Sequence, residues 1–131
     1  MKTLTLGVVK FVITIIFVFA VLKFILPARG VQQITVNELK SQLKDDSIQF
    51  IDVRQAGKYN QFHIFGFKNI PLSEIRKQAN MLSKDREIVT ICQTGTQGNR
   101  ACKKLKRQGF TKLSNVRGGL STWEPIHIDR T

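Results

Sequence analysis

The fold is decided by the stretch EIVTICQTGTQG, residues 87–98. Its first six residues form a short apolar run that ends at Cys92, which is typical of a buried strand. The next six residues are small and polar, and Gly95 and Gly98 allow the backbone to curl. A helical pattern follows over residues 98–108. The stretch therefore predicts a strand, a tight loop and a helix in direct succession.

Strand-like and helix-like segments alternate on both sides of this stretch. Strands are predicted to begin at Ile34 and to cover residues 48–53, 68–70 and 113–116. Helices or helical turns are predicted at residues 35–43, 56–60 and 73–82. Thr35 and Glu38 have the spacing of a capping box, and Ser73 can cap the third helix. This alternation predicts an α/β domain with a central, mainly parallel sheet and helices on both faces.

Cys92 is the candidate nucleophile of this domain. Ligands of parallel sheets bind at the carboxyl ends of the strands, beside helix N-termini, and Cys92 occupies such a position. Backbone N–H groups that point into a curled loop form an anion-binding nest, and the positive end of the following helix stabilises a thiolate. The alternative is a small core residue, as most free cysteines are. Spacing alone supports the two equally.

The chain begins with an apolar, basic segment. Residues 4–26 are interrupted only by Thr5, Gly7, Lys10, Thr14 and Lys23. As a helix they would span about 34 Å, which is enough to cross a bilayer core. We interpret residues 1–26 as a transmembrane anchor. The alternatives are a cleaved signal peptide, disfavoured because no small-x-small site follows, and a buried soluble helix.

The remaining residues divide into a linker, 27–33, and one domain, 34–131. A slight excess of positive charge after the anchor favours a cytoplasmic domain, as in a single-pass protein of a bacterial inner membrane. The length of 131 residues excludes a two-lobed enzyme. Two cysteines ten positions apart indicate neither a disulfide framework nor a zinc site. His63 and His127 have no partner at ligand spacing, so no metal is expected.

The domain resembles the rhodanese-like domain family over about residues 34–123. The resemblance rests on motifs in a fixed order: Ile51-Asp52-Val53-Arg54 with Tyr59, His63-Ile64-x-Gly66, Asn69-Ile70-Pro71-Leu72, Cys92-Gln93-Thr94-Gly95, Gly109-Phe110 and Val116-x-Gly118-Gly119-x-x-x-Trp123. It implies a three-layer rhodanese-like fold, here behind one N-terminal transmembrane helix.

The resemblance also implies sulfur transfer without a cofactor. The Cys92 thiolate would attack the outer sulfur of a small sulfane-sulfur donor, such as thiosulfate, and become a persulfide. A thiol or cyanide acceptor would then remove that sulfur in a second step. The persulfide would be held by backbone N–H groups of the active-site loop, namely those of Gln93, Thr94, Gly95, Thr96, Gln97 and Gly98.

Two positions of the loop depart from the family pattern, and a third bears on a rival chemistry. Gln93 and Gln97 stand where many members have arginine, so thiosulfate is in doubt as the physiological donor, and Arg100 is the candidate to contact an anion instead. Gly98 stands where the related cysteine phosphatases need arginine, which argues against phosphatase activity. These departures leave a second interpretation open: a membrane-tethered binding module of rhodanese fold with weak catalysis.

Other candidate residues have structural interpretations. Cys102 is expected in the core, Asp52 and Arg54 are expected to organise a turn, and His63 is expected to be structural. Phe62, Phe65 and Phe67 crowd one loop, and Phe65 is the one expected to be exposed.

A basic stripe lies on the predicted helix that follows the loop. Its members follow helical spacing: Arg100, Lys103, Lys104 and Arg107. Solvated surface is the default meaning of such a stripe. Near a membrane, it would also suit anionic lipid or an acidic protein partner. Nucleic-acid binding is disfavoured because no aromatic platform accompanies the charges.

Overall fold

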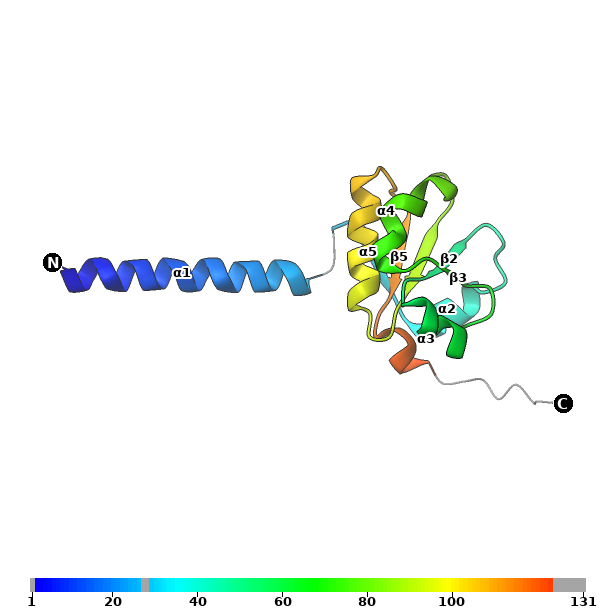
Figure 1. Ribbon diagram of the computed structural model, residues 1–131, viewed down its shortest axis with the longest axis horizontal. Helices are drawn as coiled ribbons and strands as arrows, with labels where there is room; N and C mark the ends of the chain where they lie inside the picture. Colours follow the sequence, from blue (N-terminus) through cyan, green and yellow to red (C-terminus); the bar gives the residue numbers. More distant parts are fainter. Residues whose placement is uncertain (1, 27–28, 124–131) are drawn as a thin grey trace.

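A computed structural model describes residues 2–26 and 29–123, and Figure 1 shows a long helix that extends away from one small domain. Three short 3-10 helices are labelled η. The elements in chain order are α1 (Lys2–Ile25), β1 (Val31–Ile34), α2 (Val36–Gln42), β2 (Gln49–Asp52), α3 (Ala56–Gln61), β3 (Lys68–Asn69), η1 (Leu72–Glu74), α4 (Ile75–Gln78), η2 (Ala79–Met81), β4 (Ile88–Ile91), α5 (Thr96–Arg107), β5 (Leu113–Val116) and η3 (Gly119–Thr122).

The domain is built on a five-stranded sheet in the order β1-β5-β4-β2-β3. Every pairing between neighbouring strands is parallel, which confirms the predicted parallel sheet. β4 lies in the middle, between β5 and β2, and all four of its residues are buried. The carboxyl end of β4 is therefore the centre of the edge where ligands of such sheets bind.

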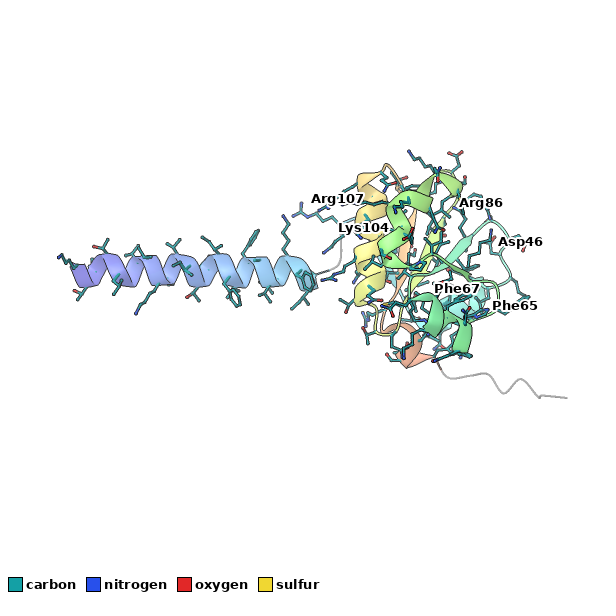
Figure 2. The ribbon with its side chains drawn as sticks, in the orientation of Figure 1. Asp46, Phe65, Phe67, Arg86, Lys104 and Arg107 are labelled. Carbon is teal, nitrogen blue, oxygen red and sulfur yellow. The ribbon has the colours of Figure 1, made fainter. Side chains whose placement is uncertain are left out.

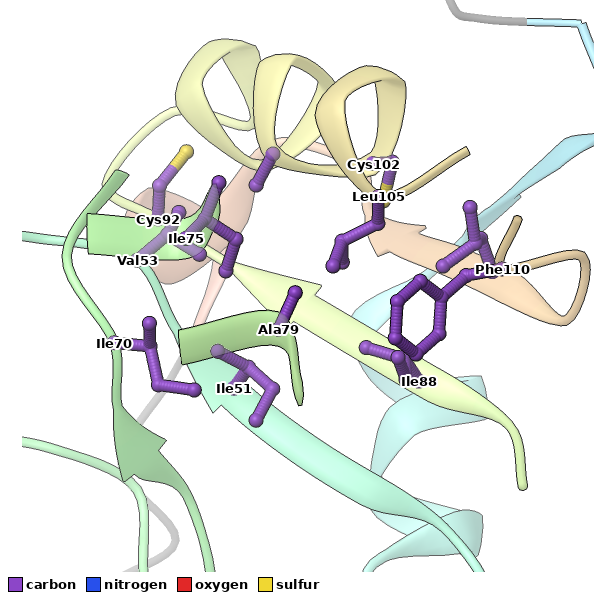
Figure 3. Close-up of a cluster of buried hydrophobic side chains, with 12 residues drawn as sticks. Ile51, Val53, Ile70, Ile75, Ala79, Ile88, Cys92, Cys102, Leu105 and Phe110 are labelled. Atoms are coloured by element: carbon purple, nitrogen blue, oxygen red, sulfur yellow. The ribbon is translucent and has the colours of Figure 1, made fainter. Parts of the chain in front are cut away.

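Two apolar clusters pack on opposite faces of the sheet, because alternate residues of each strand point to opposite sides. Ile88 belongs to one cluster, with Ile75 of α4 and Leu105 of α5. Figure 3 shows this cluster between the strands and the two helices. Val89 belongs to the other cluster, with Leu39 of α2. The layers are thus helix, sheet and helix, as predicted.

The capping box at the start of α2 is confirmed. The backbone N–H of Glu38 donates to Thr35 Oγ1 at 3.2 Å, and the backbone N–H of Thr35 donates to Glu38 Oε2 at 2.9 Å. Each bond satisfies a donor that the helix itself leaves without a partner, and such a cap contributes about 1 kcal/mol. Two residues thus fix where α2 begins.

Three predicted boundaries were wrong. Residues 31–33, assigned to the linker, form β1 with Ile34 and pair in parallel with β5. Ser73 caps no helix, because the segment starts as η1 after Pro71 and reaches α4 only at Ile75. α5 begins at Thr96, two residues before the predicted start. Residues 27–28 of the predicted linker and 124–131 of the predicted domain lie outside the described residues.

The helix α1 is long and apolar enough to cross a membrane, and it is the one such helix in residues 2–26 and 29–123. None of its side chains is buried against the domain. That exposure excludes the buried core helix of a soluble protein. A membrane anchor and a signal sequence both have this length and composition.

Candidate active site

The Cys92 side chain lies directly after β4 and is held by two backbone N–H groups. The amide of Gly95 donates to Cys92 Sγ at 3.0 Å, and the amide of Gly98 donates to it at 3.3 Å. Figure 3 shows the sulfur beside the first turn of α5. The loop therefore curls around the sulfur, as the sequence predicted.

The curl depends on Gly95, which forms the N-cap of α5. Its φ is +98°, in the left-handed region that residues with a side chain rarely adopt. The backbone thereby turns from the loop into the helix, so that the N–H groups at the start of α5 face the sulfur. The first N–H groups of a helix have no partner within it and carry its partial positive charge. They are suited to hold a thiolate or a persulfide anion.

Asn115 supports the loop from the neighbouring strand β5. Its side-chain nitrogen donates to the carbonyl of Gly95 at 3.1 Å and to Gln33 Oε1 at 3.1 Å. Thr90 Oγ1 of β4 donates to Asn115 Oδ1 at 3.2 Å. Through Asn115, these bonds connect the loop to three strands, β5, β4 and β1. Asn115 was not predicted from the sequence, although an asparagine inside the predicted strand 113–116 was a signal for it.

The N-terminal side of the loop, at Cys92 and Gln93, rests on η3. The backbone N–H of Leu120 donates to the carbonyl of Cys92 at 2.9 Å, and that of Ser121 donates to the carbonyl of Gln93 at 2.9 Å. A Cβ at Gly119 would lie 2.2 Å from the Cys92 carbonyl oxygen. The two segments approach this closely only because residue 119 is glycine, which explains Gly119 of the Gly118-Gly119 motif.

The structure brings together some of the predicted loop residues and leaves others apart. Gly95 and Gly98 are buried and donate to the sulfur. The other four loop residues expose their side chains, and no bond from their N–H groups to Sγ is formed within residues 29–123: Gln93, Thr94, Thr96 and Gln97. Arg100 does not reach the loop either, because its guanidinium lies over the Phe24 ring of α1 at 4.2 Å.

Asp52 and Arg54 form a buried ion pair that organises the turn after β2, as predicted. Arg54 Nη2 lies 2.8 Å from Asp52 Oδ2 and also donates to the carbonyl of Phe62 at 2.6 Å. The side chain of Asn69 donates to the carbonyls of both paired residues. These groups hold the turn and do not contact Cys92.

His63 is structural, as predicted. Its ring stacks on that of Tyr59 with centroids 3.8 Å apart, and its Nδ1 lies 2.9 Å from the Tyr59 carbonyl. Phe67 is buried, whereas Phe65 is 95% exposed, as predicted. Figure 2 places Phe65 on the side of the domain away from α1. Phe62 is also half exposed, which the sequence did not predict.

Cys102 is a core residue, as predicted. It is fully buried on the inner face of α5, and its sulfur lies 3.2 Å from Thr90 Oγ1. Burial raises the pKa of the Cys102 thiol to about 12, because desolvation disfavours the thiolate. Cys102 and Cys92 are both free thiols. No three residues among His, Cys, Asp and Glu form a metal-binding group in residues 2–26 and 29–123, and His127 lies outside those residues.

Comparison with known proteins identifies relatives of the domain. The sequence matches the family model of the rhodanese-like domain over residues 35–125. It is 36% identical over 97 residues to "Putative sulfur carrier protein YrkF" of Bacillus subtilis, covering 73% of this chain and 52% of that protein, so the chain spans about half the length of that relative. It is 28% identical to the thiosulfate sulfurtransferase GlpE of Shewanella oneidensis, covering 70% of this chain and 91% of that protein.

Solved structures show the same fold. The human single-domain sulfurtransferase TSTD1 superposes with a TM-score of 0.65 at 27% identity, covering 72% of this chain and 96% of that one. The reduced CoADR-RHD of Bacillus anthracis superposes with a TM-score of 0.65 at 31% identity, covering 71% of this chain and 16% of that one.

Proposed function

The chain belongs to the rhodanese-like domain family, and from this premise we propose that it is a membrane-anchored sulfurtransferase that carries sulfane sulfur on Cys92. Named sulfurtransferases are among its relatives. The observation that carries the proposal is the sulfur of Cys92, which accepts hydrogen bonds from two backbone N–H groups at the start of a helix. This surrounding suits an anion on sulfur and needs no cofactor.

In the first half-reaction, the Cys92 thiolate attacks the outer sulfur of a sulfane donor. With thiosulfate, a sulfur–sulfur bond forms to Cys92 while the bond between the two donor sulfurs breaks. Sulfite leaves with the electron pair of that bond, and Cys92 becomes a persulfide. The N–H groups of Gly95 and Gly98 donate to Cys92 Sγ and stabilise the attacking thiolate.

In the second half-reaction, a thiolate or cyanide attacks the outer sulfur of the persulfide. The new bond forms to the acceptor, and the Cys92 thiolate leaves with the electron pair of the broken sulfur–sulfur bond. The enzyme thus returns to its starting state without an external oxidant or reductant. Double displacement of this kind gives ping-pong kinetics.

The proposal places the domain at a membrane. It is supported by the length and apolar composition of α1 and by the exposure of all its side chains. The slight excess of positive charge after α1 favours a domain on the cytoplasmic side, as in a single-pass protein of a bacterial inner membrane. Carbonate extraction of membranes from cells that express the full chain tests the anchor: the protein stays in the membrane pellet. If the protein is instead recovered in the supernatant and lacks its N-terminal leader, the anchor is contradicted.

A second function is favoured by one observation. In the described part of the chain, Cys92 Sγ accepts bonds from the backbone only, and Arg100 lies against α1 instead. A loop without a cation suits a tethered binding module with weak turnover. The two functions are separated by steady-state formation of thiocyanate from thiosulfate and cyanide. The sulfurtransferase forms thiocyanate with parallel double-reciprocal plots, and Cys92→Ser abolishes this activity whereas Cys102→Ser retains it. The binding module forms thiocyanate only slightly above the Cys92→Ser background.

A further inference from the structure

A cleft of about 770 Å³ lies between the end of α1 and the outer face of α5. One wall is apolar and comes from α1, where Phe19, Leu22 and Phe24 contribute side chains. A second, smaller groove follows α1 further toward its N-terminus and shares Phe19 and Leu22 with the cleft. The apolar lining of the two hollows therefore follows one face of the helix, called here the apolar path.

The other wall of the cleft is basic. It comes from α5, and together with two cations at the end of α1 and after it, five cations line the cleft: Lys23, Arg29, Arg100, Lys103 and Arg107. None of the lining residues is acidic, and the first acidic residue of the chain is Glu38. Figure 2 shows Arg107 on the part of α5 that faces α1. The cleft thus concentrates positive charge without an internal counter-charge.

Contacts between the two helices hold the basic wall in place. The guanidinium of Arg100 lies 4.2 Å from the centroid of the Phe24 ring, and Lys103 Nζ donates to the carbonyl of Lys23 at 3.1 Å. Lys104 points elsewhere and donates to the carbonyl of Leu72 at 3.3 Å. The predicted basic stripe therefore divides, and three of its four members enter the cleft.

We propose that this cleft binds the phosphate headgroup of an anionic membrane lipid. The proposal rests on the anchor assigned under the proposed function. If α1 spans the bilayer, its end at Ile25 lies at headgroup depth, and the basic wall meets the phosphates there. Arginine side chains bind phosphate through paired N–H groups. The apolar path along α1 receives an acyl chain of the same lipid.

The combination of a basic wall and an apolar wall favours a lipid over an acidic protein as the ligand of the cleft. An acidic surface would use the basic wall but would leave the apolar path beside it empty. A phospholipid matches both, because its charge and its hydrocarbon are joined at the same depth. Bound lipid would hold α5 along the membrane surface. Phe24 also lines a small hollow beside Thr94 and Gly95, so the end of the anchor lies next to the active-site loop.

Native mass spectrometry of the full chain in mild detergent tests the site. The protein receives equimolar phosphatidylglycerol and phosphatidylcholine with identical acyl chains. One basic residue near an anionic lipid favours binding about fivefold, so phosphatidylglycerol adducts exceed phosphatidylcholine adducts by about fivefold or more. The variant Arg100→Gln/Lys103→Gln/Arg107→Gln lowers this ratio by about fivefold or more, while Lys23 and Arg29 remain in the cleft. The control Lys44→Gln/Lys58→Gln/Lys68→Gln removes the same charge outside the cleft and keeps the preference.

Equal binding of the two lipids by the wild type, or equal loss of preference in both triple variants, overturns the headgroup site. Polyglutamate, an acidic polymer, is the second probe. If the wild type binds it, the cleft variant does not, and neither lipid is preferred, the cleft binds an acidic protein and the lipid headgroup site is overturned. Carbonate extraction separates the failures: a soluble full chain overturns the anchor and the site together, whereas a membrane-bound chain without lipid preference overturns the site alone. Sulfur transfer is measured independently of both.

Discussion

Gly98 and Asn115 meet so closely that a Cβ on Gly98 would lie 2.0 Å from Asn115 Oδ1. Asn115 is fully buried and occupied by bonds to its neighbours, so it has little freedom to move away. The amide of Gly98 at the same time donates to Cys92 Sγ. The close approach of α5 to β5 therefore sets the position of the helix end that holds the sulfur.

The first prediction concerns Gly98→Ala. The added methyl overpacks the contact with Asn115, so the free energy of unfolding falls by about 1–3 kcal/mol. The fluorescence of Trp123, the single tryptophan of the chain, follows unfolding of the domain in urea. Gly57→Ala is the matched control, because a Cβ there meets nothing within 4 Å and α3 gains a better helix former. Equal stability of Gly98→Ala and the wild type contradicts the close approach.

The second prediction assigns Asn115 a positioning role. Asn115→Ala removes the side-chain bond to the Gly95 carbonyl, so the loop loses its support from β5. We expect sulfur transfer to fall by about tenfold or more, because small displacements of a catalytic group cost this much. The rate is measured without urea, at a temperature where circular dichroism shows that the variant is folded. The exposed Asn80→Ala is the control, and an unchanged rate in Asn115→Ala rules out the role.

The third prediction concerns the buried pair of Asp52 and Arg54. Arg54→Met leaves the Asp52 carboxylate buried without its partner, and this costs about 3–5 kcal/mol of unfolding free energy. The double variant Asp52→Asn/Arg54→Met removes the unpaired charge and recovers part of the loss. Urea denaturation of the four proteins completes a double-variant cycle. A double variant whose loss equals the sum of the losses in Asp52→Asn and Arg54→Met would show that the pair is not energetically coupled.

The fourth prediction follows from Cys102. Its thiol has a pKa of about 12 in the folded protein against an ordinary 9.0. Between these values the unfolded chain has released the proton and the folded chain has kept it, so stability falls as pH rises, by up to about 1.4 kcal/mol per pH unit. Below pH 9 both states are protonated, and the group contributes no pH dependence.

Cys102→Ser isolates this contribution. The serine hydroxyl takes the place of the thiol beside Thr90 Oγ1 and does not ionise in that pH range. Unfolding free energies of both proteins under reducing conditions are compared below pH 9 and midway between 9 and 12. The wild type loses more stability than the variant over this interval. Parallel pH profiles would mean that the Cys102 environment is not as described.

Much of the fold could be predicted from the sequence because it depends on local patterns. The apolar run at residues 88–91 and the capping box at Thr35 are read from neighbouring residues alone, and both are confirmed. The position of Cys92 at the carboxyl end of a central strand follows from the alternation of elements. Residues 31–33 were assigned to the linker because an edge strand can carry polar residues, here the exposed Gln32 and the half-buried Gln33.

The rest of the site depends on contacts between distant segments. Asn115 meets the loop only because β5 lies beside β4. Arg100 turns toward Phe24 only because the end of α1 lies against α5. Helical spacing placed the four basic residues on one face, but it could not show that Lys104 turns away from the other three. Such relationships arise from packing, which a single sequence does not display.

The central claim is that Cys92 carries the transferred sulfur, and the intact mass of the full chain tests it most directly. After incubation with thiosulfate, or with another sulfane donor, and removal of the excess, the wild type and Cys102→Ser gain the mass of one sulfur atom. Cyanide returns both to the original mass, and Cys92→Ser gains nothing. A wild-type protein that gains no sulfur from any sulfane donor, or a Cys92→Ser protein that still gains it, would contradict the account.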